Sequence, residues 1–323
     1  MKPGKISENV LKRSVLKYLD QNQTEIARGA GIGNDCALFA FSKGAATATC
    51  SLSVKGKEKV RHAVFAAVNN LSAAGQQAKY LLLTITLPER AREIKLQEIM
   101  EEATQICREY EMQIVGGHTE VSTNVTDIIV TVTALSGESA QMKIPDKVTD
   151  YDIVLSGYIG MEAAGLVALQ KEEELSERFP KWLLDDVKAY KTHVSVAQAV
   201  QIATEQGEVL MHDVGEGGVF AALWELGQRT ESGLTIDIKK IPMRQSVVEI
   251  CNHYDLNPYE LLSQGCLLIV TKDGESLAEQ LIEADIPAAV IGTMTDSNDR
   301  IIQNGEEIRY MDLPKPDQIR KLL

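Results

Sequence analysis

The 323-residue sequence predicts an α/β fold, in an α+β arrangement of sheets and helices, divided into two domains. Residues 91–110 carry apolar side chains at the spacing of a helix with one buried face. Residues 127–135 are rich in β-branched side chains, which is typical of a buried strand. The same patterns recur after a polar stretch at residues 137–152 that contains glycine and proline. A chain of this length commonly forms about two domains, so we expect domains at residues 1–140 and 141–323.

The first domain alternates helical and strand patterns. A helix is expected to stop at Gly75, and Pro88 is expected to close a strand. Besides the helix and strand named above, the predicted elements are a helix at 8–19, a strand at 45–54, a helix at 60–74 and a strand at 80–87.

The second domain begins with an apolar strand pattern and continues in the same alternation. A charge run at residues 171–177 indicates a solvated helix end. The predicted elements are a strand at 153–157, a helix at 162–170, a helix at 195–206, a glycine-bearing loop at 212–218 that leads into a helix, a strand at 267–270, a helix at 275–284 and a strand at 288–291.

Composition excludes several classes of protein. The net charge is −13 and no basic cluster occurs, which argues against nucleic-acid binding. No apolar run approaches the ~18 residues of a membrane span, and the N-terminus lacks the apolar core of a signal peptide. Five cysteines without a Cys-x-x-Cys spacing predict neither a disulfide framework nor a zinc site. We therefore expect a cytoplasmic protein without membrane contact.

Glycines with polar neighbours mark the first two candidate ligand loops. Residues 115–120 (Val-Gly-Gly-His-Thr-Glu) lie between the predicted helix and strand, and glycine lets backbone amides approach a phosphate closely. A tight turn is the alternative. In residues 29–39, Asp35 follows a glycine cluster, where it could cap a turn or hold Mg²⁺. Neither stretch is a P-loop.

The third candidate loop is residues 212–218, which contain Asp213, Glu216 and Gly217. A loop that feeds a helix N-terminus can bind an anion through free amides and the helix dipole. The same dipole attracts acidic side chains without any ligand, so a purely structural role for Asp213 and Glu216 stays open.

The order and spacing of these segments resemble the aminoimidazole ribonucleotide synthase (PurM-like) superfamily, in particular its hydrogenase-maturation, HypE-like and AIR synthase-related branch. The resemblance covers nearly the whole chain. Its motifs are residues 31–37 (Gly-Ile-Gly-Asn-Asp-Cys-Ala), 69–75 (Asn-Asn-Leu-Ser-Ala-Ala-Gly), 116–120, 212–218 and 262–265 (Leu-Ser-Gln-Gly).

The resemblance implies an N-terminal domain that forms a homodimer and a C-terminal α/β domain. It also implies ATP and Mg²⁺ as cofactors, and activation of a carbonyl or amide oxygen of a small substrate by phosphorylation. It implies Asp35 and Glu120 as metal ligands, with His118 and Asp213 as candidate catalytic residues. The nucleotide contacts that it implies are Gly33, Asn69, Asn70, Gly116, Gly117, Thr119, Glu216 and Gly217.

Departures from the family pattern leave a second interpretation open. Ser51 and Asn70 stand where the family usually has metal-binding aspartates. The sequence ends in Lys-Leu-Leu, whereas HypE-type proteins end in a reactive cysteine, so we expect no reaction of that particular kind. The alternative is a non-catalytic relative that binds a small ligand or a protein partner.

Overall fold

The computed structural model describes residues 4–5, 8–19, 26–28, 38–39, 44–52, 59–137 and 142–323. The chain divides into two compact units. Unit 1 contains Met1–Leu71 and Gln76–Ala140, and unit 2 contains Ser72–Gly75 and Gln141–Leu323. No helix in the described part of the chain has the length and apolar content that a membrane crossing needs.

Unit 1 contains a five-stranded sheet in the order β1-β6-β5-β7-β4 and a separate β2-β3 pair. Its strands are β1 (Gly4–Lys5), β2 (Ile26–Arg28), β3 (Leu38–Phe39), β4 (Thr47–Leu52), β5 (Ala78–Pro88), β6 (Gln113–Ser122) and β7 (Ile129–Ser136). Its helices are α1 (Glu8–Ser14), the 3₁₀ turn η1 (Leu16–Tyr18), α2 (Lys59–Ala73) and α3 (Glu93–Glu109).

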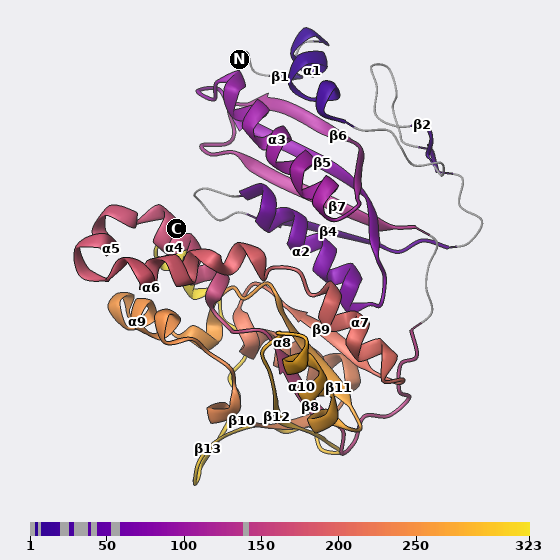
Figure 1. The fold of residues 1–323 in the computed structure, drawn as a ribbon, viewed down its shortest axis with the longest axis vertical. Coiled ribbons are helices and arrows are strands. Elements are labelled where there is room, and N and C mark those ends of the chain that lie inside the picture. The colour runs from indigo at the N-terminus through magenta and orange to yellow at the C-terminus, as the bar shows by residue number, and fades with distance from the viewer. Residues whose placement is uncertain are drawn as a thin grey trace. The chain divides into compact units, whose positions relative to one another are not determined.

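Helices α2 and α3 cover one face of this sheet (Figure 1). The central strand β5 directs Leu83, Ile85 and Leu87 into the core beneath them, and all three are buried. Phe65 of α2 meets Tyr110 at the end of α3 with ring centroids 4.9 Å apart. Because strand side chains alternate between faces, the residues between these apolar positions lie on the opposite face, which no described helix of unit 1 covers.

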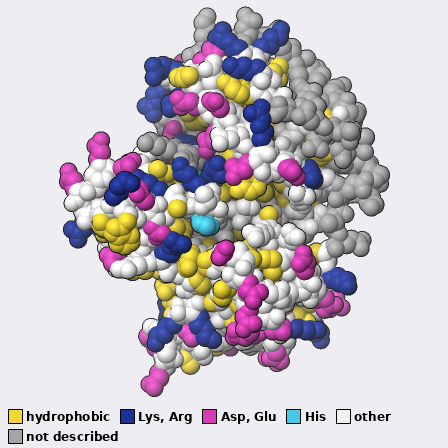
Figure 2. Space-filling model, viewed as in Figure 1, with side chains coloured by type: hydrophobic (Ala, Val, Ile, Leu, Met, Phe, Trp, Pro, Cys, Tyr) yellow, Lys and Arg dark blue, Asp and Glu magenta, His cyan; other side chains and the backbone are white. Residues whose placement is uncertain are grey.

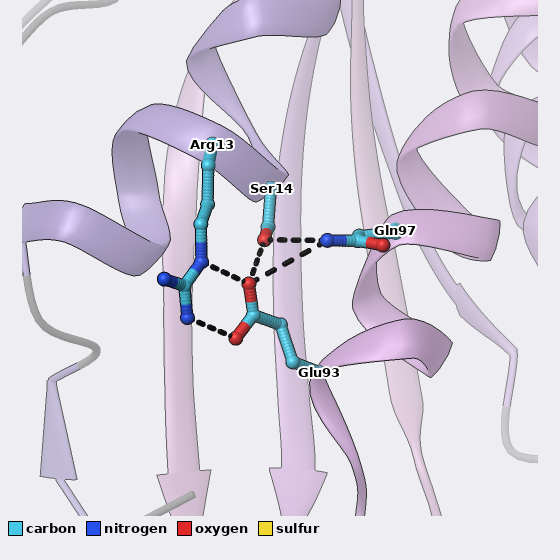
Figure 3. A network of polar contacts seen from close by, with 4 residues as sticks. All are labelled: Arg13, Ser14, Glu93 and Gln97. Carbon is cyan, nitrogen blue, oxygen red and sulfur yellow. Dashed lines mark hydrogen bonds and ion pairs between the residues drawn. The ribbon is translucent and has the colours of Figure 1, made fainter.

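Helix α1 is fastened to the start of α3 by a polar network (Figure 3). Both carboxylate oxygens of Glu93 accept hydrogen bonds from the Arg13 guanidinium, and Ser14 donates to the same carboxylate at 2.7 Å. Arg13 and then Ser14 lower the pKa of Glu93 to about 2, because both stabilise the ionised form.

Unit 2 contains a seven-stranded sheet in the order β14-β13-β10-β12-β8-β11-β9. Its strands are β8 (Asp152–Ser156), β9 (Leu210–Val214), β10 (Gly233–Asp237), β11 (Cys266–Thr271), β12 (Ala288–Thr295), β13 (Arg300–Asn304) and β14 (Glu307–Tyr310). Its helices are α4 (Met161–Gln170), α5 (Glu172–Arg178), α6 (Lys181–Lys188), α7 (Ala197–Glu205), α8 (Gly218–Thr230), α9 (Gln245–Tyr254) and α10 (Gly274–Glu283), with 3₁₀ turns η2 (Ala189–Thr192), η3 (Ile238–Lys240), η4 (Pro258–Glu260) and η5 (Gln318–Lys321).

Helices bury both faces of this second sheet. Leu155 of β8 lies in a cluster with the apolar face of α8, whereas its neighbour Val154 lies in a second cluster with residues of α7 and α10. A strand covered on both faces is apolar along its central residues, as residues 153–155 of β8 and 266–270 of β11 are. Acidic and basic side chains are interspersed over the face of the molecule that Figure 2 shows.

Most predicted helices and strands are confirmed to within a few residues, but two predicted loops are wrong. Residues 115–120 belong to strand β6, and residues 212–214 belong to strand β9. Residues 171–177 fall largely in a separate helix, α5. The sequence patterns also missed β10, α6, α9 and the β13-β14 hairpin.

Candidate functional site

The glycine pair Gly116-Gly117 forms a bulge in β6. Ile114 pairs with Leu81 and Gly116 pairs with the next residue, Leu82, so Val115 is an extra residue in β6. Gly117 has φ +143°, and a Cβ atom there would lie 1.8 Å from the Leu83 carbonyl oxygen. Only glycine fits this position, because the neighbouring strand occupies the space of a side chain.

The bulge is followed by His118 and Glu120 on the uncovered face of the sheet. His118 pairs with Thr84 of β5, and its Nε2 lies 3.5 Å from Glu120 Oε2. Both side chains are substantially exposed, at 52% and 40%. Thr119 lies between them in sequence but is buried on the helix-covered face, so the structure separates it from the other two.

A row of hydroxyl groups continues this polar surface across the sheet. Ser51 of β4 pairs with Thr131 of β7, Thr131 pairs with Thr84, and Thr84 pairs with His118. Thr131 Oγ1 donates to Ser51 Oγ at 2.9 Å, and the hydroxyls of Thr49 and Thr133 are likewise 2.9 Å apart. We call the uncovered face formed by Ser51, Thr84, Thr131, His118 and Glu120 the polar sheet face.

The width of this face limits which residues can share a metal ion. Neighbouring strands lie about 4.8 Å apart, so the three steps from Ser51 to His118 span roughly 14 Å. Glu120 lies two residues beyond His118 in β6, so it is at least as far from Ser51. Mg²⁺ ligands lie about 2.1 Å from the ion, so Ser51 and Glu120 cannot bind the same ion. Among the described residues, no three His, Cys, Asp or Glu side chains are grouped as a metal site would require.

Of the remaining predicted residues of unit 1, two asparagines lie in helix α2, and two residues lie outside the described part of the chain. Asn69 is buried in α2, and Asn70 is exposed with its side-chain amide donating to Ala66 O at 2.7 Å. Asn70 therefore satisfies a carbonyl of its own helix. Gly33 and Asp35 lie outside the residues that the structure describes.

In unit 2, His212 and Asp213 lie on opposite faces of the edge strand β9. His212 Nε2 lies 2.8 Å from Glu225 Oε2 of α8. Burial raises the pKa of Asp213 above its ordinary value, and the charge of Glu225 adds to this rise, whereas His212 opposes it. A carboxyl group whose protonated form is favoured in this way can exchange a proton with a substrate.

Glu216 and Gly217 form the turn between β9 and α8, and the C-terminal residues of the chain contact both. The Gly217 amide donates to Asp317 Oδ2 at 2.8 Å, and Arg320 Nε donates to Glu216 Oε1 at 2.8 Å. Burial is the main cause that raises the pKa of Asp317 to about 6. Asp213 thus belongs to strand β9, whereas Glu216 and Gly217 belong to the turn that follows it, so the three predicted residues do not share one loop.

Sequence reasoning missed Thr84 and Thr131 on the polar sheet face, as well as Asp317 and Arg320 beside the turn. The alternation of threonine with apolar residues in β5 and β7 signals an uncovered polar face. Asp317 follows a proline and precedes a short helical turn, which is typical of a capping residue, but no local signal links it to Gly217.

Comparisons with known proteins agree with this architecture. The family model for the N-terminal domain of AIR synthase related proteins matches residues 33–136, and the C-terminal model matches residues 152–303. A putative hydrogenase expression/formation protein of Methanocaldococcus jannaschii is 27% identical, covering 99% of this chain and 97% of its own. The carbamoyl dehydratase HypE of Bradyrhizobium diazoefficiens is 27% identical over 64% of this chain and 59% of its own length.

The crystal structure of the hydrogenase maturation protein HypE in complex with ATP has the same fold. It superposes with a TM-score of 0.79 at 19% identity, covering 98% of this chain and 97% of that one. These matches confirm the resemblance seen in the sequence motifs. The chain therefore belongs to the AIR synthase related protein family and has its two-domain, PurM-like fold.

Proposed function

We propose that the chain is a cytoplasmic, ATP-dependent enzyme that phosphorylates a carbonyl or amide oxygen of a small substrate. Family membership, a relative named carbamoyl dehydratase and a structural neighbour in complex with ATP support this proposal. The observation that carries it is the polar sheet face, where His118 and Glu120 follow a glycine bulge and stand beside a row of hydroxyl groups. Hydroxyl and imidazole donors of this kind suit the oxygens of a triphosphate.

Mg²⁺ would be held by Glu120 together with Asp35. Mg²⁺ is commonly bound by one or two carboxylates, and its other positions are filled by water and substrate phosphates. Glu120 meets this requirement because its carboxylate is partly exposed on the polar sheet face. Asn70 and Ser51 are neutral and already hydrogen-bonded, so we assign them no metal. When bound, the ion would neutralise charge on the phosphates.

The proposed reaction has two steps that conserve atoms and electrons. The substrate oxygen attacks the terminal phosphorus of ATP, and the bond from that phosphorus to the bridging oxygen breaks with release of ADP. In the later step a nucleophile, or the substrate's own nitrogen as it loses a proton, forms a new bond to the activated carbon while the carbon–oxygen bond breaks and phosphate leaves. We assign His118 as a donor to phosphate oxygens and Asp213 as the group that takes a substrate proton, because burial favours its protonated form.

A homodimer formed through unit 1 completes the proposal. The outer strands β1 and β4 of the unit 1 sheet each pair with only one strand among the described residues. Unpaired strand edges can join a second copy of the same sheet. Sedimentation of the purified chain would show a dimer if this proposal is right.

Calorimetric titration with a non-hydrolysable ATP analogue tests the nucleotide site. We expect binding in Mg²⁺ that disappears in EDTA, because the phosphates need the ion as a bridge to carboxylate. Glu120→Gln should weaken binding about 10-fold or more, since a charged partner is typically worth ~1.5–3 kcal/mol. Glu98→Gln, an exposed change on α3, is the matched control and should bind as the parent does. No binding by the parent in either condition would overturn the proposal.

A further inference from the structure

Strand β14 forms an exposed edge of the unit 2 sheet. Among the described strands it pairs with β13 alone, in the hairpin that Figure 1 labels at β13. All of its residues are exposed, and its two large apolar side chains, Ile308 and Tyr310, are 64% and 70% exposed. In β9, the strand at the opposite edge, three of the five residues are buried. An edge strand with exposed apolar side chains is a ready site for pairing with another strand.

The backbone of β14 presents hydrogen-bonding groups to its outer side at every second residue. The Met311 amide donates to the Arg300 carbonyl at 2.8 Å, so it faces β13. Because these directions alternate along a strand, the amide and carbonyl of Arg309 also face β13. Those of Ile308 and Tyr310 face away from it. A second strand can donate to and accept from these two residues.

The side chains of β14 divide between the two faces of the sheet. Arg309 pairs with Ile302, which is buried in the core cluster that contains the apolar face of α8. Arg309 and Glu307 therefore lie on the α8 side of the sheet, whereas Ile308 and Tyr310 lie on the other side. One face of the strand thus carries a basic and an acidic group two residues apart, and the other carries two apolar groups.

This pattern is complementary to itself when two copies of β14 run antiparallel about a two-fold axis at Ile308. Glu307 of each copy then lies opposite Arg309 of the other, which forms two opposite-charge pairs. An axis at Glu307 or at Arg309 would place like charges opposite each other. An axis at Tyr310 would leave both charges without an opposite charge directly across. The charges of β14 therefore favour the register centred on Ile308.

We propose that β14 of one copy pairs antiparallel with β14 of a second copy, centred on Ile308, and joins the two unit 2 sheets into one. Such an interface uses the same patch on both copies. It is separate from the unit 1 homodimer and does not rest on the proposed activity. Because β14 has only 4 residues, we expect this contact to form at higher protein concentration than a unit 1 dimer.

Sedimentation equilibrium of full-length charge variants tests the pairing. Glu307→Arg and Arg309→Glu each place like charges across the axis, so each should weaken this association about 10-fold or more. The double variant Glu307→Arg/Arg309→Glu restores the opposite-charge pairs and should associate as the parent does. Glu283→Arg makes the same reversal at an exposed residue of α10 and is the matched control.

The charge variants also separate this contact from the unit 1 homodimer, which would raise the mass of every variant equally. Equal association of all these proteins at concentrations up to about 1 mM overturns the proposal. The proposal is overturned in the same way if β14 binds only an extended segment of a different protein.

Cysteine cross-linking tests the register itself. Residues in a hydrogen-bonded antiparallel pair have Cα atoms about 5.5 Å apart, a separation that a disulfide can span. Residue 308 lies opposite its own copy, so Ile308→Cys should give a covalent dimer on a non-reducing gel after mild oxidation. Tyr310→Cys changes an exposed residue on the same face, but the two copies of residue 310 are four residues apart in this register, roughly 13 Å along the strand. It should cross-link no more than the parent, and equal cross-linking of the two variants overturns the register.

Discussion

Gly117 shows how a single residue type determines the geometry of the polar sheet face. Its φ is +143°, and a Cβ atom at this position would come within 1.8 Å of the Leu83 carbonyl oxygen, which excludes any side chain. Gly117→Ala should therefore lower the free energy of unfolding by roughly 2–5 kcal/mol, because backbone strain and overpacking add. Urea denaturation followed by hydrogen exchange in β5 and β6 measures this loss.

Gly116→Ala is the matched control for that substitution. A Cβ at Gly116 would meet only the end of the Leu82 side chain, at 3.0 Å, which can move. We expect a loss of about 1 kcal/mol or less. Equal losses for the two variants would show that the bulge does not require glycine at position 117.

The sequence names candidate site residues but does not give the environment of each one. The sequence singled out His118 and Glu120 as candidate site residues beside a glycine pair, and the structure places both on one open face. It could not separate Thr119 from them, because strand alternation becomes visible only when the segment is known to be a strand. The roles assigned to all these site residues remain predictions, and Gly33 and Asp35 lie outside the described residues.

At the scale of single elements, the most informative wrong prediction is the loop at residues 115–120, which the structure shows to be part of strand β6. Its Gly-Gly pair has the composition of a turn, yet β5 pairs with the strand on both sides of the bulge, and β1 pairs with it beyond the bulge at Glu120 and Val121. Glycine inside a strand pattern often marks a bulge, so the signal was present but ambiguous. Helix α3 was predicted well because its apolar spacing is local and its core residues are buried as that spacing requires.

The attachment of α1 to α3 gives a pH-dependent prediction. The pKa of Glu93 is lowered to about 2 from an ordinary 4.5, so its ionised form stabilises the docked helix. This contribution is complete above about pH 4.5 and is lost as the pH falls through about 2. Glu93→Gln should speed amide exchange in α1 about 2- to 5-fold at pH 7, the range expected of an exposed pair.

The control for this change lies on the same helix. Lys95→Gln removes an exposed i,i+3 pair with Glu98, and both residues of this pair belong to α3. Exchange in α1 should stay at the parental rate in this variant. The difference between the parent and Glu93→Gln should also shrink toward pH 2, and a difference that persists there would contradict the assigned role of the Glu93 charge.

At the scale of the whole molecule, a destabilising substitution in the core of one compact unit should leave the stability of the other unit unchanged. Leu155 is fully buried in β8 of unit 2, and Leu155→Ala should cost about 2–5 kcal/mol. The only tryptophans, Trp182 and Trp224, are also in unit 2. Leu155→Ala should therefore shift the fluorescence transition in urea, whereas Gly117→Ala should leave that transition nearly unchanged. A common shift in both variants would show that the units unfold as one.

The sequence by itself determined the α/β class, most helices, the strands with continuous apolar or β-branched runs, and membership of the family. These features depend on periodicity and on motif order, which are local properties of the chain. Only the tertiary structure decided that β6 and β9 are strands, that Thr119 faces the core, and that Asp317 caps Gly217 across 100 residues. Pairing and capping between distant segments depend on which groups folding brings together, and spacing along the chain does not encode that choice.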